Sequence, residues 1–435
     1  MNFTEAEQYI RNLEKFGIKL GLDNMNKLLD LLGSPHEKLK FIHVGGTNGK
    51  GSVSHMLAKI LHGAGYRVGL YTSPHIQSYR ERIIVNGEMI PKCKFADIVK
   101  NINLVSKQMD ELPTEFEFMT ALAFEYFISR KVDIALMEVG MGGRLDATNI
   151  IPSAELSIIT NISRDHTEHL GAYIDDIANE KAGIIKNGGS LITTEKNPQV
   201  ISIFDELCRK RGSRFFPLDG NIKIESGPIL TMGERLVQEC SIASKHFKVE
   251  RLHLPMLGKH QVINASAAVL ASQLLHEKGY SIDSEHLRSG LESTKIPGRI
   301  QLMNLEPLIV LDVSHNYRGV LALKQVLEEI IPLGGRLILV AAYLDDKDRG
   351  EIARAWGDFP SAVIVTKPES SRGRDWKRTA EYFKEFVSEV YMERKIEDAV
   401  ILGENLTEQR DCLCMAGSFY MMKNAEMQIL QMLSS

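Results

Sequence analysis

The sequence predicts an α/β protein with two domains, each built on a doubly wound, mainly parallel sheet. Short apolar runs alternate with segments of helical periodicity through most of the chain, as expected for successive strand-helix-strand units. After Pro297-Gly298, a dipeptide typical of turns, the same alternation starts afresh. We therefore expect a first domain over 1–296 and a smaller, Rossmann-like α/β domain over 297–435.

In the first domain, residues 41–44 form an apolar run that breaks into glycines, which predicts a strand entering a loop. The segment 213–255 changes character, because short strand-like pieces at 221–225 and 227–232 are separated by polar turns, and it predicts a small antiparallel patch. Further strands are expected over 67–71, 132–139 and 154–162, and helices over 4–16, 24–32, 52–64, 116–130 and 260–277.

In the second domain, four apolar runs predict strands, and helical periodicity fills two of the gaps between them. No internal repeat or low-complexity tract changes this division. The strands are expected over 307–313, 334–343, 361–368 and 398–403, and the helices over 319–331 and 377–390.

Composition narrows the class of protein. The 435 residues carry a formal net charge of -4 without a long block of one sign, which disfavours binding to a nucleic-acid backbone. Five scattered cysteines are too few for a disulfide framework. The N-terminus lacks the pattern of a signal peptide, and no apolar stretch approaches the roughly 20 residues that span a bilayer. We therefore expect a cytoplasmic protein that has no membrane or nucleic-acid partner.

A glycine-rich loop follows the first apolar strand and leads directly into a helix. Such loops bind phosphate, because backbone N–H groups and the helix N-terminus converge on the oxygens while a lysine supplies positive charge. The first domain is thus expected to be of the P-loop ATPase type, although Val44 and Gly51 depart from the usual G-x-x-x-x-G-K-[ST] pattern. The candidate nucleotide-binding residues are Gly46, Thr47, Asn48, Gly49, Lys50, Gly51 and Ser52.

Glu138 ends the apolar strand over 132–139, so it is expected at the carboxyl edge of the sheet, beside the phosphate loop. A carboxylate there could hold the Mg²⁺ of a bound nucleotide or cap a helix, and position alone does not decide between the two. His166 and His169 could suggest a zinc pair, but no third histidine or cysteine is near in the sequence, and we reject zinc.

The glycine loop and several later segments occur together in an order that resembles one family. GTNGKGS at 46–52 is followed by SPH…ER within 73–82, MEVGMGGRLDATN at 137–149, DHTEHLG at 165–171 and EKAGI at 180–184. GKHQVINASAA, IPGR, LDVSHN and AGSFYM then follow at compatible spacing. Over essentially the whole chain, these motifs resemble the Mur ligase superfamily, and in particular its folylpolyglutamate synthase branch.

The resemblance implies two metal sites. Ser73, Glu138 and His166 match the Mg²⁺ ligands of folylpolyglutamate synthases. Lys181, which would be a surface lysine on the sequence alone, matches a lysine carbamylated by CO₂, and the carbamate would be a ligand for a second Mg²⁺. Dependence on a monovalent cation stays open.

The resemblance also implies residues for the nucleotide and its reacting phosphate. Asn264, Arg299, Asp312 and His315 match family positions with that role, whereas Arg299 without the resemblance could equally form a structural ion pair. The family pattern DGAHN reads DVSHN here, and no side chain with an expected role is lost. The residues expected to take part in catalysis are Lys50, His166, Lys181 and His315.

A further set matches segments that surround the pterin in bifunctional bacterial members. Phe116 could stack on a flat heterocycle, although chemistry alone favours a place in the core, and Asp146 could accept hydrogen bonds from ring N–H groups. The set comprises Lys19, Leu20, Gly21, Thr114, Glu115, Phe116, Glu117, Leu145, Asp146 and Ala147.

The family implies an ATP-dependent amide ligase, expected to act as a monomer. A substrate carboxylate would attack the γ-phosphorus of ATP to give an acyl phosphate, and the amine of L-glutamate would then displace phosphate. The implied acceptors are 7,8-dihydropteroate and reduced folates that carry γ-linked glutamates. We favour an enzyme with both activities over a folylpolyglutamate synthase that does not use dihydropteroate.

Three other functions fit less well. A cell-wall ligase would bring a separate N-terminal domain, and only about 40 residues precede the strand of the loop. A nucleotide-binding switch protein leaves the SPH…ER, DH…LG and LDVSHN segments unexplained. A Rossmann dehydrogenase would need G-x-G-x-x-G spacing, which the loop lacks.

Overall fold

The computed structural model describes residues 1–17, 19, 21–164, 167–171 and 173–434. The chain divides into two compact units. The first comprises Met1–Ser226, Cys240–Leu252 and Gln261–Thr294, and the second comprises Gly227–Glu239, His253–His260 and Lys295–Ser435. Each unit has its own large, mainly parallel sheet with helices packed on it, which confirms the predicted α/β class.

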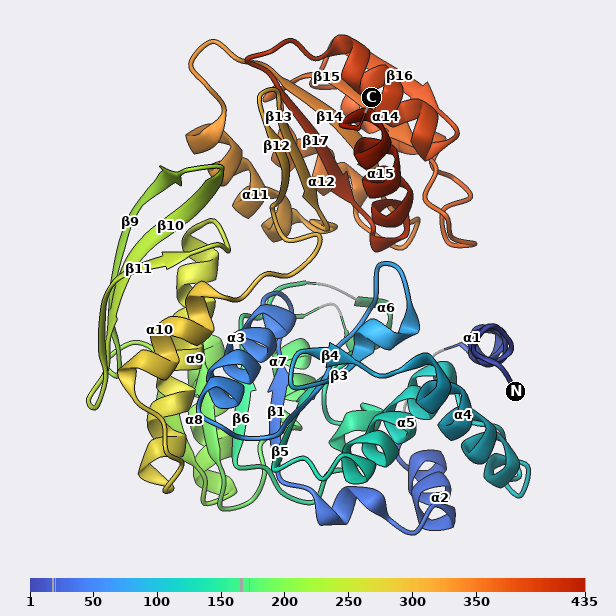
Figure 1. The fold of residues 1–435 in the computed structure, drawn as a ribbon, viewed down its shortest axis with the longest axis vertical. Coiled ribbons are helices and arrows are strands. Elements are labelled where there is room, and N and C mark those ends of the chain that lie inside the picture. Colours follow the sequence, from blue (N-terminus) through green and yellow to red (C-terminus); the bar gives the residue numbers. More distant parts are fainter. Residues whose placement is uncertain (18, 20, 165–166, 172, 435) are drawn as a thin grey trace. The chain divides into compact units, whose positions relative to one another are not determined.

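The sheet of the first unit has eight strands in the order β4-β3-β2-β5-β1-β6-β7-β8. Six neighbouring strands of this sheet, in the order β2-β5-β1-β6-β7-β8, pair in parallel. β3 and β4 lie beyond β2 and pair antiparallel, which makes them an antiparallel edge. β1 lies between β5 and β6, so the loop after β1 emerges in the middle of the carboxyl edge (Figure 1). The strands are β1 (Phe41–Gly45), β2 (Val68–Tyr71), β3 (Ile83–Val85), β4 (Glu88–Met89), β5 (Ile134–Glu138), β6 (Leu156–Ile159), β7 (Ser190–Thr193) and β8 (Arg214–Pro217).

The helices of this part of the chain pack in pairs: α1 along α4, α4 along α5, α10 along α3 and α7 along α8. Apolar side chains of α4 and α5 form one core with β1 and β5, and those of α7 and α8 form a second. The α-helices are α1 (Phe3–Arg11), α2 (Asp23–Leu31), α3 (Lys50–Gly63), α4 (Lys92–Ser106), α5 (Glu115–Ser129), α6 (Thr167–Leu170), α7 (Ile174–Ala182), α8 (Pro198–Lys210), α9 (Lys259–Glu277) and α10 (Ser284–Glu292). The 3₁₀ helices are η1 (Asn12–Phe16), η2 (Pro35–Lys38), η3 (Tyr79–Arg82) and η4 (Ala147–Ile150).

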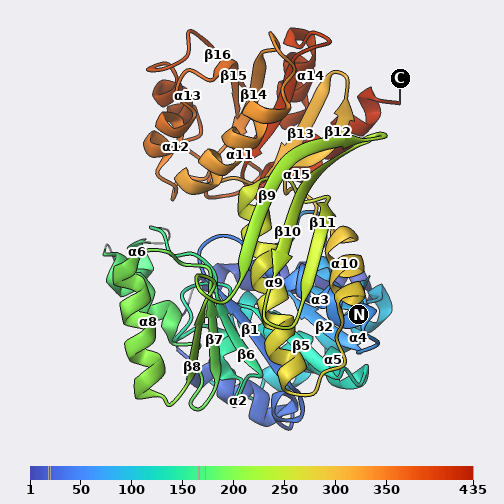
Figure 2. The ribbon, with the colours of Figure 1, turned by 90° about the vertical axis from the view of Figure 1, so that its left-hand side faces the viewer.

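A separate three-stranded sheet, in the order β11-β10-β9, occupies most of the segment where a small patch of strands was expected (Figure 2). Its strands are β9 (Lys223–Met232), β10 (Arg235–Ala243) and β11 (Lys248–Leu254). The expected pieces at 221–225 and 227–232 are one continuous strand. Gly227 does not break it, because its missing side chain makes room for Glu239, whose Oε1 would lie 3.0 Å from a Cβ at this position.

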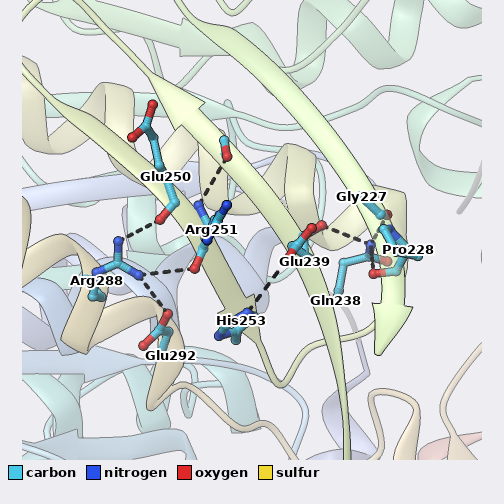
Figure 3. Close-up of polar contacts among 10 residues, drawn as sticks. Gly227, Pro228, Gln238, Glu239, Glu250, Arg251, His253, Arg288 and Glu292 are labelled. Carbon is cyan, nitrogen blue, oxygen red and sulfur yellow. Dashed lines mark hydrogen bonds and ion pairs between the residues drawn. The ribbon is translucent and has the colours of Figure 1, made fainter. Parts of the chain in front are cut away.

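Side-chain hydrogen bonds hold the strands of this sheet (Figure 3). Arg288 of α10 donates to the carbonyl oxygen of Glu250 over 2.6 Å and to that of Arg251 over 3.2 Å, so it fixes β11 on the first unit. Within the second unit, Gln238 Nε2 donates to the carbonyl oxygen of Gly227 over 2.7 Å.

The sheet of the second unit has six strands in the order β12-β13-β17-β14-β15-β16, and all its pairs are parallel except β12 with β13. Its strands are β12 (Gln301–Leu305), β13 (Leu308–Asp312), β14 (Leu337–Ala342), β15 (Pro360–Thr366), β16 (Glu389–Glu393) and β17 (Cys412–Gly417). Its helices are α11 (Tyr317–Ile330), α12 (Arg349–Trp356), α13 (Lys377–Phe383), α14 (Ile396–Leu406) and α15 (Phe419–Met432). Within the described ranges, no helix combines the length and the apolar character needed to cross a bilayer.

Two local predictions in this unit were wrong. Residues 398–403 are not a strand but part of α14, where Ala399, Val400 and Gly403 are buried at helical spacing. The helix expected over 377–390 ends at Phe383, and β16 begins at Glu389. In both places a short apolar pattern fits the two-residue period of a strand as well as the 3.6-residue period of a helix. Packing against the rest of the unit decides which element forms.

Candidate active site

The loop after β1 has the backbone geometry that a phosphate-binding loop requires. Gly46 has a φ of 130°, and a Cβ at this residue would lie 1.8 Å from Thr160 Oγ1, so only glycine fits. Gly49 has a φ of 90° and precedes α3, which begins at Lys50. A Cβ on Gly49 would lie 2.5 Å from Asn264 Oδ1, which places the Asn264 amide directly against the loop.

Two residues that directly follow β6, Thr160 and Asn161, form hydrogen bonds with this loop. The Thr47 N–H donates to the carbonyl oxygen of Asn161 over 2.8 Å, and the Asn48 N–H donates to Asn161 Oδ1 over 3.2 Å. Thr160 Oγ1 donates to the carbonyl oxygen of Asn48 over 2.7 Å. Thr160 and Asn161 were not identified from the sequence, although polar groups directly after an apolar strand could have indicated a role.

Two lysines direct their ammonium groups at carbonyl oxygens of the loop. Lys50 Nζ donates to the carbonyl oxygens of Gly46 and Thr47, both over 3.2 Å. Lys181 on α7 is buried, and its Nζ donates to the carbonyl oxygen of Gly46 over 2.9 Å. The structure therefore brings Lys181 to the phosphate loop, whereas the sequence alone favours a place on the surface.

Glu138 at the end of β5 is buried beside the same loop. The Ser73 N–H lies 3.4 Å from Glu138 Oε2, and a Cβ on Gly51 would lie 3.4 Å from that oxygen. Glu138, Ser73 and the start of α3 thus meet at one point, and their oxygens are the donor type that Mg²⁺ prefers. His166 lies outside the described residues. Among those described, no three His, Cys, Asp or Glu side chains cluster as metal ligands.

In the second unit, Arg299 and His315 lie beside one aromatic ring, that of Phe419. The Arg299 guanidinium lies 5.7 Å from the ring centroid of Phe419, and the His315 ring centroid lies 6.2 Å from it. His315 Nδ1 lies 2.8 Å from the carbonyl oxygen of Val313. Because a carbonyl only accepts, Nδ1 carries the hydrogen, and Nε2 is the basic nitrogen of this ring.

Asp312 is buried, and His260 half-buried, next to Arg299. Burial raises the pKa of Asp312, and the positive charge of Arg299 and the N–H groups of Ile300 and Ser314 oppose that rise. Burial, with a smaller contribution from Arg299, lowers the pKa of His260 to about 4, so this histidine is neutral at pH 7. His260 therefore adds no positive charge beside Arg299 at pH 7. His260 was not identified from the sequence.

The predicted pterin segments meet in the first unit. The Gly21 N–H lies 3.5 Å from the carbonyl oxygen of Leu145, which brings the segment at 19–21 to that at 145–147. The Phe116 ring lies 5.9 Å from the ring of Tyr71 and covers Gly140, where a Cβ would come within 2.5 Å of Phe116 Cζ. Leu20 lies outside the described part of the chain.

Thr114 and Glu117 form the capping box at the start of α5, which the T-x-x-E pattern of the sequence could have indicated. Thr114 caps α5, its Oγ1 accepts from the Glu117 N–H over 3.2 Å, and Glu117 Oε2 accepts from the Thr114 N–H over 2.8 Å. Half-buried Glu115 forms an ion pair over 3.1 Å with Arg82, which is buried. Lys19 pairs with Glu111 over 2.7 Å on the surface.

Asp146 is buried, and backbone and side-chain donors occupy both of its carboxylate oxygens. Oδ1 accepts from the Thr148 N–H over 3.0 Å and from Thr148 Oγ1 over 2.5 Å. Oδ2 accepts from the Met141 N–H over 2.9 Å, and the nearby Gly140 N–H also lowers the pKa of this carboxyl group. Burial raises the pKa of Asp146, and these four donors oppose the rise. Ala147, the next residue, is buried and begins η4.

Family models and solved structures match almost the whole chain. The model of the Mur ligase middle domain matches residues 44–272, and that of the Mur ligase glutamate ligase domain matches residues 298–419. The dihydrofolate synthase/folylpolyglutamate synthase of Bacillus subtilis is 32% identical over 427 residues, which cover 96% of this chain and 97% of that protein.

Two structures illustrate the likeness in fold. Escherichia coli FolC in complex with DHPP and ADP superimposes with a TM-score of 0.87 at 27% identity, over 100% of this chain and 99% of that one. Mycobacterium tuberculosis folylpolyglutamate synthase, complexed with ADP and AMPPCP, gives a TM-score of 0.88 at 29% identity, over 98% of this chain and 99% of that one.

Proposed function

Because this chain belongs to the Mur ligase family, in its dihydrofolate synthase/folylpolyglutamate synthase branch, we propose that it is an ATP-dependent ligase that adds L-glutamate to 7,8-dihydropteroate and to tetrahydrofolates with one or more glutamates. The observation that carries this proposal is the loop between β1 and α3, with Lys50, Lys181 and Glu138 directed at it. This arrangement suits the transfer of a phosphoryl group.

The proposed reaction has two steps. A carboxylate oxygen of the acceptor attacks the γ-phosphorus of ATP, the bond to the β,γ-bridging oxygen breaks, and ADP leaves, giving an acyl phosphate. The deprotonated α-amine of L-glutamate then attacks the acyl carbon, and inorganic phosphate leaves as the amide forms. The protein forms no covalent intermediate, so it acts by positioning and by electrostatic stabilisation.

Lys50 and the backbone of Gly46 to Ser52 are the groups we assign to the nucleotide phosphates. Lys50 Nζ donates hydrogen bonds to the carbonyl oxygens of Gly46 and Thr47. Phosphate oxygens can replace these carbonyl oxygens as acceptors when a nucleotide binds. We place Asn264, Arg299 and Asp312 at the nucleotide as well. His315 is the candidate to accept the proton of the glutamate amine, because Nε2 is its basic nitrogen.

Ser73, Glu138 and His166 are the residues that would hold Mg²⁺, and the oxygens of Ser73 and Glu138 fit such an ion. When bound, Mg²⁺ would neutralise charge on the phosphates.

We propose that Lys181 is carbamylated and holds a second Mg²⁺; its burial at the loop supports this assignment. A ¹³C NMR spectrum of protein incubated with ¹³C-bicarbonate would detect the carbamate, and Lys181→Met should lack that signal. A monovalent cation would be detected by activity in K⁺ compared with a buffer free of alkali metal ions.

The acceptor is proposed to bind among the segments at 19–21, 114–117 and 145–147. Phe116 supports this assignment, because its aromatic ring lies beside Gly140 and is only partly buried. Thr114, Glu117 and Asp146 would contribute mainly by shaping the walls, since their polar atoms already bond within the protein.

We further propose that residues 1–296 carry the ATP and pterin functions and that residues 297–435 form the glutamate-ligase domain. A cytoplasmic, monomeric enzyme is the form we expect, and five free cysteines are compatible with a reducing compartment. Size-exclusion chromatography with light scattering tests the monomer.

Identification of the product by mass spectrometry tests the function. With Mg-ATP, L-glutamate and 7,8-dihydropteroate, the product should gain one glutamyl residue and be dihydrofolate. With tetrahydrofolate it should gain γ-linked glutamates. Product from tetrahydrofolate alone would leave a folylpolyglutamate synthase, and no glutamyl product from either pterin would exclude the proposal.

A further inference from the structure

His43 lies in the centre of β1, three positions before the first glycine of the phosphate loop, and is completely buried. It pairs in register with Met137 of β5 and Ser157 of β6. A polar side chain in this position needs a partner, and its Nε2 lies 2.8 Å from Thr148 Oγ1, 105 positions further along the chain.

The direction of this hydrogen bond follows from the next one. Thr148 Oγ1 lies 2.5 Å from Asp146 Oδ1, and N–H groups donate to both oxygens of the carboxyl group. These donors favour the ionised form against the burial that raises the pKa of Asp146, and we take Asp146 as the acceptor. The one hydroxyl hydrogen of Thr148 therefore goes to Asp146. His43 must donate from Nε2 to Thr148, because the hydroxyl oxygen is left as an acceptor.

Burial lowers the pKa of His43 well below its usual value, so the ring is neutral and its single hydrogen lies on Nε2. Lys186, the charged group that faces it, lowers that pKa further. His43, Thr148 and Asp146 thus form a relay in which each hydrogen has a defined place.

The far end of the relay fixes the wall of the proposed acceptor site. Asp146 accepts from the Met141 N–H, and the Phe116 ring covers the preceding residue, Gly140. A change at His43 can therefore reach the residues around Phe116 without contact with the acceptor itself.

The turn that carries Thr148 has a second, independent anchor. Lys186 Nζ donates to Asn149 Oδ1 over 2.9 Å and to the carbonyl oxygens of Asn149 and Ile151 over 3.2 and 2.7 Å. If the relay is broken, these three bonds still hold η4. We expect the loss to change the orientation of Asp146 rather than to unfold the turn.

We propose that His43 is a positioning residue for the pterin acceptor, which acts through Thr148 on Asp146 and links the strand of the phosphate loop to the acceptor wall. This inference rests on the proposed function, because it assumes that the acceptor binds beside Phe116 and Asp146.

Steady-state kinetics of four single variants test the relay. His43→Leu and Thr148→Val remove a donor, and each should raise the KM for 7,8-dihydropteroate about five- to tenfold while the KM for ATP stays within about twofold. His43→Gln and Thr148→Ser keep a donor at each position and should restore the acceptor KM to within about threefold. The double variant His43→Leu/Thr148→Val should lose no more than either single variant, because both break the same relay.

An unchanged acceptor KM in His43→Leu and Thr148→Val would overturn the inference, and so would equal increases in the KM for ATP and for the acceptor. If His43→Leu does not fold, as judged by circular dichroism, the pair Thr148→Val and Thr148→Ser gives the same decision. Parent enzyme that makes no glutamyl product from any pterin would overturn the proposed function and this inference with it. Active parent enzyme with unaffected variants would overturn the inference alone.

Discussion

Lys181 of α7 donates a hydrogen bond from Nζ to the carbonyl oxygen of Gly46, 135 positions away, over 2.9 Å. This bond ties a buried cation to the first glycine of the phosphate loop. The family resemblance suggested a role for Lys181 that its position in the sequence did not. The structure supplies a physical reason to test that role, because a buried lysine is costly unless its charge is used or modified.

Replacement of Lys181 by methionine should lower kcat about 10²-fold or more, because the side chain can then neither carry a carbamate nor bond to the loop. The rate of ADP release at saturating substrates measures the effect. Lys196→Met is the matched control, since Lys196 is exposed, and it should keep the parent rate. A Lys181→Met variant with at least half of the parent kcat would contradict the assignment.

Lys50→Met should abolish most of the phosphoryl transfer, with a fall in kcat of about 10²- to 10³-fold, because a positive charge is removed where negative charge develops. Rapid-quench measurement of ADP formation isolates this step. Lys59→Met on the same helix α3 removes an equal charge away from the loop and should have little effect. Equal losses in the two variants would show that only the overall charge of the helix matters.

Gly49→Ala and Gly65→Ala form a matched pair, since both glycines have a φ of 90°. Each alanine should cost about 1 kcal/mol of stability for its backbone conformation. Gly65 has open space around it, whereas a Cβ on Gly49 would lie 2.5 Å from Asn264 Oδ1. Only Gly49→Ala should therefore displace Asn264 and raise the KM for ATP. Kinetics and urea unfolding check both effects, and an unchanged KM in Gly49→Ala would refute the importance of this close approach.

Asp411 should contribute stability that depends on pH. Burial alone would raise the pKa of Asp411, but hydrogen bonds from Arg336 and from the Glu408 N–H outweigh burial and hold that pKa below its usual value. Since the folded protein binds this proton more weakly than the unfolded chain, the contribution is complete above the unfolded pKa of about 3.9 and is lost as the pH falls through the folded pKa.

Asp411→Asn should accordingly lower the free energy of unfolding by about 1–3 kcal/mol at pH 7. The difference from the parent should shrink below about pH 4. Urea unfolding between pH 3 and about 7 measures it, and Asp398→Asn, at an exposed position of α14, is the control. A difference that stays constant with pH would contradict the linkage.

The sequence carried enough information for the elements whose pattern is strong. The apolar residues 41–44 followed by glycines predicted β1, the loop and α3, and the structure has them there. Residues 398–403 were misassigned because a run of six residues fits a strand or one face of a helix, and the burial of Val400 and Gly403 against the sheet decides for α14.

The site could be predicted only in part, for a similar reason. The order of the motifs led us to expect Lys50, Glu138 and Lys181 at one nucleotide and metal site. In the structure all three lie at the loop between β1 and α3. Thr160 and Asn161 were not identified, because their partners lie more than 110 positions away and depend on β1 and β6 being neighbours. The bond between His43 and Thr148 has the same origin, since no local pattern relates the two residues.

ADP release from the purified protein with Mg-ATP and L-glutamate tests the proposed ligase activity, with parallel reactions that contain 7,8-dihydropteroate, tetrahydrofolate or no pterin. We expect glutamate-dependent turnover with both pterins and none without. Absence of glutamate-dependent turnover with either pterin would contradict the proposed activity.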